Sequence, residues 1–408
     1  MEVVHARCAG LDVHKDLIVA CRRKALNKTA RRETESFGTT TAELMRLSAW
    51  LADWEVSHVV MESTGVYWKP VLNVLGGDFE LIVVNPQHVK ALPGRKSDVK
   101  DAEWLAELLT HGLVRPSFIP EPPIQGLRDL TRTHKQITRQ RVSHVQRIQK
   151  HLQACNIRLD SVLSDVHGMS GMRIVRAIVD GETDPTKLAS LVFRVKASRE
   201  KLIAALDGRV TPTTRALLRT HLDMIESADK NLAILEKEID ALLVPFSEAV
   251  ALLETIPGVG HATACTIVAE IGVDMTRFPS PGHLVSWAGL CPGLNESAGK
   301  KRSSKLKKGD PWLKTALCQA ALAAQRCTRR GQLHDLYFRV RSRRGAKKAV
   351  MAVAASILTS IHAMLTNHAP YHELAHQHRA PKNKQRAVTH HTRRLAELGF
   401  QVELRPAA

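Results

Sequence analysis

Residues 9–13 read Ala-Gly-Leu-Asp-Val, and residues 59–63 read Val-Val-Met-Glu-Ser. Each stretch is a short apolar run, typical of a buried β-strand, that meets a carboxylate at its end, Asp12 in the first and Glu62 in the second. A carboxylate in that position lies near buried surface, where an unpaired charge is strongly unfavourable unless a metal ion or a cation compensates it. Asp12 and Glu62 are therefore candidate metal ligands.

The segments around these two runs predict an α/β domain. Three short strand-like runs come first, and a helical pattern, a strand, a second helix and a strand follow. This order is compatible with a ribonuclease H-like fold. The strands are expected at residues 9–13, 17–21, a run ending at Phe37, 58–61 and 79–84, and the helices at residues 41–54 and 66–75.

Two further carboxylates, Asp98 and Asp101, stand three residues apart at the start of a predicted helix that continues through Leu108. This spacing places both on one face of the helix. Together with Asp12 and Glu62 they can hold two divalent ions, the arrangement that stabilises the attacking and leaving oxygens in phosphoryl transfer. Mg²⁺ is expected, with Mn²⁺ possible, because all the ligands are hard oxygens. On spacing alone, Asp98 and Asp101 fit a simple helix cap equally well.

The composition indicates a globular chain with a polyanionic partner. The 408 residues are 44% hydrophobic and carry a formal net charge of +19, and a cationic surface of this kind attracts phosphate. Residues 300–348 hold 16 Lys or Arg against two acids, so this stretch contributes +14 of the total. Charge alone does not separate DNA from RNA or from a membrane.

The seven cysteines are scattered and form no C-x-x-C pair, which argues against a structural zinc site. The N-terminus has no cationic segment leading into a long apolar run, and we expect no membrane partner. The expected location is the cytoplasm, in association with the nucleoid.

Residues 120–246 have a long-helical pattern with few prolines. Apolar residues recur in a heptad-like seam, which is typical of a coiled coil. Antiparallel pairing within the chain and dimerisation between chains are both open on this pattern. The seam residues are Leu218, Leu222, Ile225, Leu232, Leu235, Ile239 and Leu242.

Residues 253–264 combine the end of an apolar helix, a Pro-Gly-x-Gly turn and the start of a second helix with small residues. This pattern is typical of a helix-hairpin-helix motif, in which Pro257, Gly258 and Gly260 let the turn approach a DNA backbone and helix N–H groups bind phosphate. A plain helix-helix turn is the alternative. Helices are also predicted at residues 311–325 and 346–365, and a flexible basic tail after residue 370.

Residues 288–302 form a loop of small residues that contains Ser297 and runs into a cationic cluster. A serine there could meet a phosphate, but its hydroxyl needs a base or a metal ion for activation. From these residues alone, Ser297 cannot be distinguished from Ser303 or Ser304. The cations expected to bind nucleic acid are Lys300, Lys301, Arg302, Lys305, Lys307 and Lys308.

Five stretches, in this order, resemble the DEDD transposases of the IS110 insertion-sequence family. The similarity covers roughly residues 8–365, and the basic segment departs from the family pattern at Ser304 and Asp310, where Gly and Asn are common. The stretches are Gly-Leu-Asp-Val-His-Lys at 10–15, Met-Glu-Ser-Thr-Gly at 61–65, Lys-Ser-Asp-Val-Lys-Asp-Ala at 96–102, Ile-Pro-Gly-Val-Gly at 256–260, and Gly-Leu-Cys-Pro-Gly at 289–293 leading to Ser-Ala-Gly-Lys at 297–300.

The resemblance implies a RuvC-like catalytic domain at residues 1–119 with the tetrad Asp12, Glu62, Asp98 and Asp101. It implies a helical coiled-coil dimerisation segment at 120–247 and a transposase domain at 248–369 with Ser297 as nucleophile. It also implies donor and target DNA, an element-encoded guide RNA, and dimers or dimers of dimers in which the tetrad of one subunit completes the serine site of another. The basic tail after residue 370 has no counterpart that we recognise.

Two other classes of function remain open. A RuvC-like structure-specific endonuclease would use the four acids with metal-activated water and would not need Ser297. A non-enzymatic nucleic-acid binder would need the basic surface alone. A covalent protein-DNA adduct distinguishes the serine mechanism from both alternatives.

Overall fold

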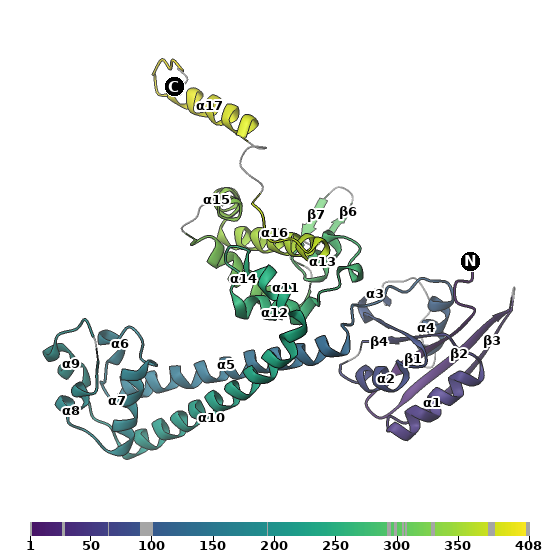
Figure 1. Ribbon diagram of the computed structural model, residues 1–408, viewed down its shortest axis with the longest axis horizontal. Coiled ribbons are helices and arrows are strands. Elements are labelled where there is room, and N and C mark those ends of the chain that lie inside the picture. Colours follow the sequence, from purple (N-terminus) through teal and green to yellow (C-terminus); the bar gives the residue numbers. More distant parts are fainter. Residues whose placement is uncertain are drawn as a thin grey trace. The chain divides into compact units, whose positions relative to one another are not determined.

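The structure is a computed structural model that describes residues 2–26, 29–63, 65–89, 101–193, 195–291, 295–297, 300–303, 306, 308–327, 331–373 and 380–404. The chain divides into two compact units, Met1–Ile119 and Pro120–Ala408, whose elements are labelled in Figure 1. The first contains a small mixed sheet with helices, and the second is almost entirely helical. The expected combination of an α/β part and a helical part is therefore confirmed.

The described residues of the first unit form a five-stranded sheet in the order β3-β2-β1-β4-β5. β1 pairs antiparallel with β2, and β2 with β3, whereas the β1-β4 and β4-β5 pairs are parallel. Each expected strand is present, and only the ends differ from the prediction. The bounds are β1 Arg7–Val13, β2 Ile18–Leu26, β3 Thr29–Phe37, β4 His58–Glu62 and β5 Glu80–Val84.

Helices cover both faces of this sheet. On one face, α1 (Thr41–Asp53) and α2 (Trp68–Leu75) pack against the apolar side chains of β1 and β4, such as Leu11 and Met61. On the other face, α4 (Asp101–Thr110) packs against Cys8 and Val60. A short helix, α3 (Pro86–Val89), follows β5. Because both faces are covered, the central strands β1 and β4 are apolar up to the residues at their ends.

Gly10 allows α4 to lie directly on β1. A Cβ atom at this position would stand 2.2 Å from the carbonyl oxygen of Ala102 and 2.5 Å from the backbone nitrogen of Ala106. Any larger residue would push the helix away from the strand, since neither backbone can yield without moving a whole element. Gly10 therefore sets the depth at which the start of α4 meets the sheet.

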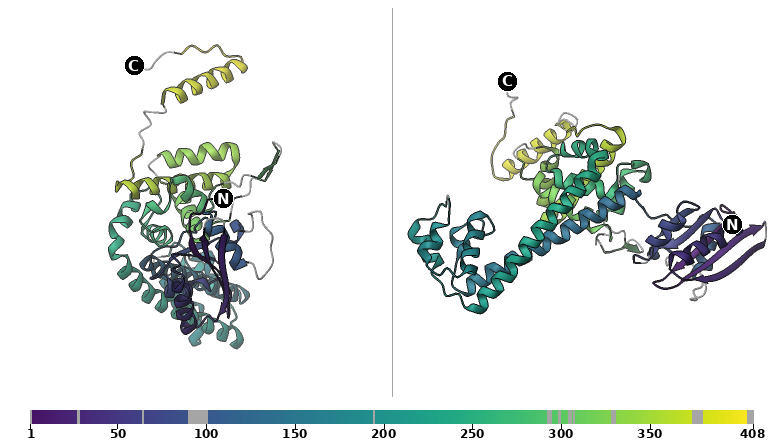
Figure 2. Two further views of the ribbon diagram at one scale, coloured as in Figure 1. Left: turned by 90° about the vertical axis from the view of Figure 1, so that its right-hand side faces the viewer. Right: turned by 60° about the horizontal axis from the view of Figure 1, so that its bottom comes forward.

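Two long helices, α5 (Pro122–Ala154) and α10 (Pro212–Leu243), pack along each other in the second unit, side by side in Figure 2. They are antiparallel, since His134 contacts Glu236 near one end and His144 contacts His221 near the other. The antiparallel pairing within the chain, which the sequence left open, is thus present. The seam residues of α10 are buried or half-buried by this pairing.

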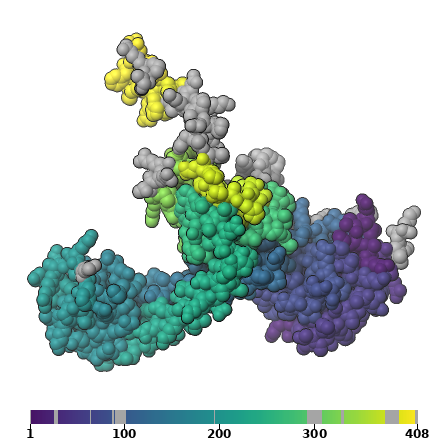
Figure 3. Space-filling view, in the orientation of Figure 1, coloured from purple at the N-terminus to yellow at the C-terminus, as the bar shows by residue number. Residues whose placement is uncertain are grey.

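Four short helices gather at the far end of this pair, and Figure 3 shows them as a separate teal lobe. Their apolar side chains form one core together with the adjoining parts of α5 and α10. Gly181, which follows the second of these helices, has a φ of +112°, a left-handed conformation suited to glycine. The helices are α6 (Leu159–Val162), α7 (Met169–Asp180), α8 (Pro185–Ser190) and α9 (Arg199–Leu206).

Most of the helices between α10 and α16 (Ala346–Asn367) pack against α16. α16 is long and apolar enough to cross a membrane by length and composition. Burial accounts for this character, because residues along its length, among them Val353, Ile357 and Ile361, are fully enclosed by neighbouring helices. The helices of this part are α11 (Ser247–Glu254), α12 (His261–Ile271), α13 (Pro281–Trp287), α14 (Pro311–Ala324) and α15 (Gln332–Arg344), with the short 3₁₀ turns η2 (Val244–Phe246) and η3 (Met275–Arg277). Of these, α12 packs on α5, α11 and α14.

Residues 380–397, within the segment expected to be a flexible tail, form helix α17 (Ala380–Glu397). The sequence reading did not predict this helix, and the flexibility of the tail as a whole stays a prediction. No glycine or proline interrupts residues 382–398, and Lys, Gln, Arg, Ala, Leu and Glu all favour a helix. A polar composition therefore excluded a buried core in this segment but did not exclude a helix.

Candidate functional site

Asp12 and Glu62 lie at the same level on neighbouring parallel strands. The register pairs Gly10 with Val60 and Leu11 with Met61, so that Asp12 and Glu62 each follow the last paired residue by one. Side chains alternate between the faces of a strand, which places Asp12 on the side of Gly10 and Glu62 on the side of Val60. Both positions belong to the face that α4 covers. The two predicted strand-end carboxylates are thus neighbours.

Helix α4 brings Asp101 to the same end of this face. The helix runs antiparallel to β1, since Cys8 contacts Thr110 at the end of α4, and Gly10 faces Ala102 at its start. The next residue of β1 on this face is Asp12, and Asp101 is the first residue of α4. Two strand ends and one helix start therefore place three of the four predicted carboxylates at one end of the sheet. Asp98 lies outside the described residues.

The donor set fits a hard divalent cation by chemistry, because three carboxylates on adjacent elements supply only oxygen ligands. The described side chains do not form a metal-binding cluster. The part of the chain that the structure describes contains no group of three or more His, Cys, Asp or Glu side chains able to hold a metal ion. The Asp12 side chain is 23% exposed, and its Oδ2 lies 3.0 Å from Nε2 of His14. This histidine contact was not anticipated from the sequence.

Other acids of the first unit have structural partners. Asp53 contacts Arg22 at 3.1 Å, Glu103 contacts Arg32 at 3.0 Å, and Asp78 accepts a hydrogen bond from Ser48 at 3.1 Å. These contacts compensate charge at the edge of the sheet and between helices.

The hairpin between α11 and α12 uses its two glycines differently. Gly258 has a φ of +89°, and a Cβ atom there would lie 2.5 Å from the carbonyl oxygen of Ala320 and 2.5 Å from the nitrogen of Ala324, both in α14. Gly260 has open space around it. Gly258 thus has a role in packing within the protein, and Gly260 faces outward. Contact of either glycine with DNA stays a prediction. Pro257 is half-buried beside them.

Ser297 ends strand β6 (Asn295–Ser297), which pairs antiparallel with β7 (Lys300–Ser303). In this register Ser297 is opposite Lys300 and Glu296 is opposite Lys301. The backbone therefore holds Ser297 and the predicted cations Lys300, Lys301 and Arg302 in one hairpin. This hairpin belongs to the second unit, and the carboxylates belong to the first. Lys308 is exposed, whereas Lys305 and Lys307 lie outside the described residues.

Helix α15 and the start of α16 carry cations that we had counted in the charge of residues 300–348 but had not selected as site residues. Six of them are exposed, and none forms an ion pair with any residue that the structure describes. Free surface cations in such density are typical of a surface that binds phosphate. They are Arg339, Arg341, Arg343, Arg344, Lys347 and Lys348.

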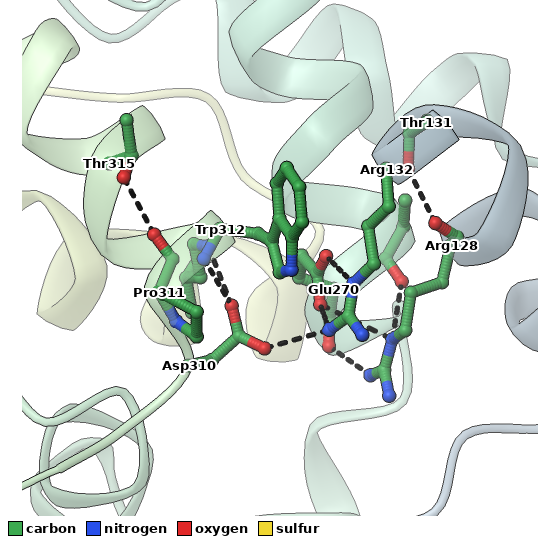
Figure 4. Close-up of polar contacts among 10 residues, drawn as sticks. Arg128, Thr131, Arg132, Glu270, Asp310, Pro311, Trp312 and Thr315 are labelled. Carbon is green, nitrogen blue, oxygen red and sulfur yellow. Dashed lines mark hydrogen bonds and ion pairs between the residues drawn. The ribbon is translucent and has the colours of Figure 1, made fainter. Parts of the chain in front are cut away.

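A buried ion network joins three helices of the second unit, as Figure 4 shows. Arg132 of α5 donates from Nε and Nη2 to both carboxylate oxygens of Glu270 in α12, at 2.8 and 2.7 Å, and also from Nη2 to Asp310 at 2.8 Å. Burial raises the pKa of the fully enclosed Glu270 carboxyl, and the hydrogen bonds from Arg132 oppose this shift. In the sequence, the only sign of this network is that Glu270 is a single acid within the apolar run Ile267 to Ile271.

Asp310, one of the two departures from the family pattern, has a structural role. Its Oδ1 accepts hydrogen bonds from the backbone nitrogens of Trp312 at 2.9 Å and Leu313 at 2.7 Å. It therefore caps α14, and its other oxygen contacts Arg132. These contacts account for an acid within an otherwise cationic segment.

Two family models match the chain. A model described as DEDD transposase of the IS110 type matches residues 9–157, and one described as transposase of the IS116/IS110/IS902 family matches residues 250–337. The first covers the sheet and its strand-end acids, and the second covers the helical hairpin and the β6-β7 hairpin. The matches thus fall on the two regions in which the candidate residues lie.

Relatives agree with these matches. A "probable family 20 transposase" of Pseudomonas aeruginosa is 27% identical over 66% of this chain and 71% of its own length. The transposase for insertion sequence element IS1111A of Coxiella burnetii is 25% identical over 89% of this chain and 90% of its own length. A pilin gene-inverting protein of Moraxella bovis is 30% identical over 31% of this chain and 40% of its own length.

The fold, the strand-end acids and these similarities together define a DNA-processing enzyme of the transposase class. More narrowly, the chain belongs to the IS110 family of insertion-sequence transposases. DNA is accordingly its partner, and a DEDD family points to the use of a divalent metal ion.

Proposed function

We propose that this transposase cuts and rejoins DNA through a covalent serine-DNA intermediate, with Asp12, Glu62, Asp98 and Asp101 carrying divalent metal ions and Ser297 as nucleophile. The observation that carries the proposal is the placement of Asp12, Glu62 and Asp101 at one end of one sheet face. In this proposal the first unit is a RuvC-like, ribonuclease H-like domain. Strand order and strand-end acids support that assignment.

The carboxylates would hold Mg²⁺ or Mn²⁺, which when bound supplies positive charge beside the phosphate and lowers the barrier to attack. Asp12 and Glu62 are held by paired strands, and Asp101 is held by the first turn of α4. Ligands on strands and helices keep their geometry better than ligands on loops. Gly10 contributes indirectly, because it allows α4 to lie close enough to β1 for Asp101 to reach this end of the sheet.

In the proposed step, Oγ of Ser297 attacks the scissile phosphorus, an O–P bond forms, and the bond from phosphorus to the leaving DNA oxygen breaks. The serine proton leaves to solvent or a base, and the leaving oxygen takes up a proton to become a free hydroxyl. The bond energy is conserved in the phosphoserine link, so rejoining to a new DNA end needs no ATP. Lys300 lies opposite Ser297 in the hairpin register, and the cations nearby favour a phosphate at this position.

The guide RNA, the subunit assembly and the cellular location belong to the same proposal. An element-encoded guide RNA would base-pair with donor and target DNA, and the cations of α15 and α16 offer a second phosphate-binding surface for it. Subunits would act as dimers or dimers of dimers, with the tetrad of one subunit serving Ser297 of another. Because α5 covers the seam of α10, a subunit contact in the segment 120–247 would use the outer faces of these helices. The protein would act in the cytoplasm at the nucleoid.

The name of the Moraxella bovis relative describes inversion of a gene, a rearrangement in which DNA is both cut and rejoined. This supports recombination over simple hydrolysis as the outcome for the present chain. The alternative within the same fold is a structure-specific endonuclease that uses metal-activated water.

The deciding experiment incubates the purified protein with its co-purified nucleic acid and labelled element-end DNA in Mg²⁺, quenches with detergent, and looks for DNA attached to protein. We expect a covalent adduct that maps by mass spectrometry to Ser297, together with a discrete non-coding RNA on sequencing the bound nucleic acid. Cleavage without any adduct would instead establish the water-using endonuclease.

A further inference from the structure

A cavity of about 470 Å³ opens among helices α5, α10, α12 and α14 of the second unit. Its volume lies in the range of about 300 to 1,000 Å³ that small-molecule sites occupy. It therefore accommodates a single nucleotide-sized group and is too small for a duplex. None of the candidate residues for cutting or phosphate binding lines it.

One wall of the cavity is aromatic. Trp312, in the first turn of α14, is half-buried, and the guanidinium carbon of Arg139 lies 5.0 Å from the centre of its ring. Figure 4 shows the Trp312 ring standing beside Arg132, whose position is fixed by Glu270 and Asp310. Unstacked nucleic-acid bases stack on aromatic rings and on guanidinium planes. The wall thus presents both kinds of stacking surface on a rigid support.

The charged groups around the cavity balance, with three cations and three acids in its lining. Glu270 is compensated by Arg132, and Glu236 contacts His134 at 3.2 Å. Lys135 and Arg139, which also line the cavity, form no ion pair with any residue in the described ranges. These two cations can each contact one phosphate, whereas a lining of balanced charge does not suit an extended polyanion.

The start of α12 adds positive potential to the cavity. His261, Ala262 and Thr263 line the cavity, and the N-cap residue Gly260 has no side chain to cap the helix. The first turn of an α-helix carries unsatisfied N–H groups and a partial positive charge. The N–H of Thr263 already donates to the carbonyl oxygen of Gly260 at 2.9 Å, so the contribution of the helix start beside Lys135 and Arg139 is chiefly its partial positive charge.

Gln319 offers the lining a group that can read a base edge, since its side-chain amide can both donate and accept hydrogen bonds. The hydroxyls of Thr138 and Thr266, which also line the cavity, donate to the carbonyl oxygens of His134 and Ala262 at 2.9 and 2.8 Å and keep only acceptor capacity. These polar groups favour a nucleobase over an apolar peptide side chain.

We propose that this cavity binds a single unpaired nucleotide of the nucleic acid on which the protein acts, with its base against Trp312 and its phosphate toward Lys135 and Arg139. The proposal rests on the proposed function only for the presence of nucleic acid. It requires neither the metal-binding acids nor Ser297. The role of the cavity would be to hold one flipped or looped-out nucleotide and so to fix the register of the bound strand.

The test uses the full-length protein in EDTA, so that no cutting occurs and the result is independent of the catalytic proposal. The probes are a DNA hairpin with one unpaired 4-thiothymidine and an RNA hairpin with one unpaired 4-thiouridine, each compared with a version in which that base is paired. We expect the unpaired probe to crosslink on α12 or α14 near Trp312, and the paired probe not to. The stronger of the two arms identifies the strand that fills the cavity.

Variants make the assignment specific. Trp312→Ala and Arg139→Gln should each weaken binding of the unpaired probe about tenfold and leave the fully paired probe within about twofold, while Trp312→Phe should retain most of the affinity because a stacking ring remains. Arg147→Gln, an exposed cation on α5 outside the cavity, is the matched control. Equal loss for paired and unpaired probes, or crosslinks only elsewhere, would overturn the proposal. A change of oligomeric state in Trp312→Ala with unchanged nucleic-acid binding would assign the cavity to a second copy of the chain.

Discussion

The guanidinium of Arg132 donates to both carboxylate oxygens of Glu270, at 2.8 and 2.7 Å, across 138 residues of sequence. The same guanidinium contacts Asp310 at 2.8 Å. Arg128 adds a hydrogen bond to the carbonyl oxygen of Ala269 at 3.3 Å. These contacts connect α5, α12 and the cap of α14. α12 is the second helix of the helical hairpin, and α14 carries Trp312 of the cavity wall. The network therefore fixes the helical hairpin relative to the long helix pair.

Glu270→Gln should destabilise the second unit by about 3 kcal/mol, because Arg128 and Arg132, which are 15% and 29% exposed, lose the charge of the fully buried Glu270 and only Arg132 keeps an acidic partner, Asp310. Urea unfolding followed by circular dichroism measures the change. Glu254→Gln removes an exposed contact with His261 and should cost less than about 1 kcal/mol. Similar losses for the two variants would show that the buried network is not a main source of stability.

Gly258→Ala should destabilise the protein by about 1 to 3 kcal/mol, since the residue has a left-handed φ and its new Cβ would collide with the backbone of α14. Gly260→Ala should change stability by less than about 0.5 kcal/mol, because open space surrounds that position. Thermal unfolding of both variants beside the parent tests the pair. A stable Gly258→Ala protein that loses only DNA affinity would show that Gly258 serves DNA contact and not packing.

Asp12→Asn and Asp101→Asn should each lower strand cleavage more than about 100-fold, given that even losing groups that only orient metal ligands costs about 10- to 100-fold. Nucleic-acid binding should remain, since the cationic surfaces are in the other unit. Cleavage in Mg²⁺ and filter binding in EDTA give the two readouts. Asp16→Asn, at an exposed turn beside β1, is the control and should cut normally. Normal cleavage by Asp12→Asn would remove it from the active site.

Neutralising Lys300, Lys301 and Arg302 together to Gln should weaken binding to unrelated duplex sequences about equally. Each lost phosphate contact lowers the slope of log K against log salt by roughly 0.9 on duplex DNA. Titrations at several salt concentrations measure that slope. The triple variant Arg341, Arg343 and Arg344 to Gln, which changes exposed cations on α15, shows by comparison how the phosphate contacts divide between the hairpin and α15. A slope equal to that of the parent would place residues 300–302 away from the DNA backbone.

Ser297→Ala should abolish cleavage and strand exchange, because no other group would form the covalent link to the DNA end. Ser303→Ala and Ser304→Ala should retain both activities, and Ser303 is the closer control because it pairs with Asn295 in the same hairpin. Gel assays of cleavage and of joined products measure the two steps separately. Wild-type rates of cutting by Ser297→Ala would rule out the serine as nucleophile and favour metal-activated water.

Local sequence determined much of this protein. The alternation of apolar residues and the carboxylates after Leu11 and Met61 predicted the strands and the acids at their ends, because strand period and strand termination depend on neighbouring residues. Helices such as α14 and α16 were predicted for the same reason. The tail was predicted less well, since charged helix formers fit an exposed helix and an irregular chain alike.

Only the tertiary structure decided which distant residues meet. The placement of Asp101 at the same end of the sheet as Asp12 depends on the absence of a side chain at Gly10, and nothing in the local pattern of either segment specifies how closely α4 approaches β1. The apolar seam of α10 packs against α5 of the same chain, although the heptad pattern of α10 fits a second chain equally well. Likewise, Glu270 within an apolar helix signals a compensating charge, but its partner, Arg132, is chosen by packing between helices. Sequence spacing restricts neighbours on one element, whereas contacts between elements are set by the burial of all of them at once.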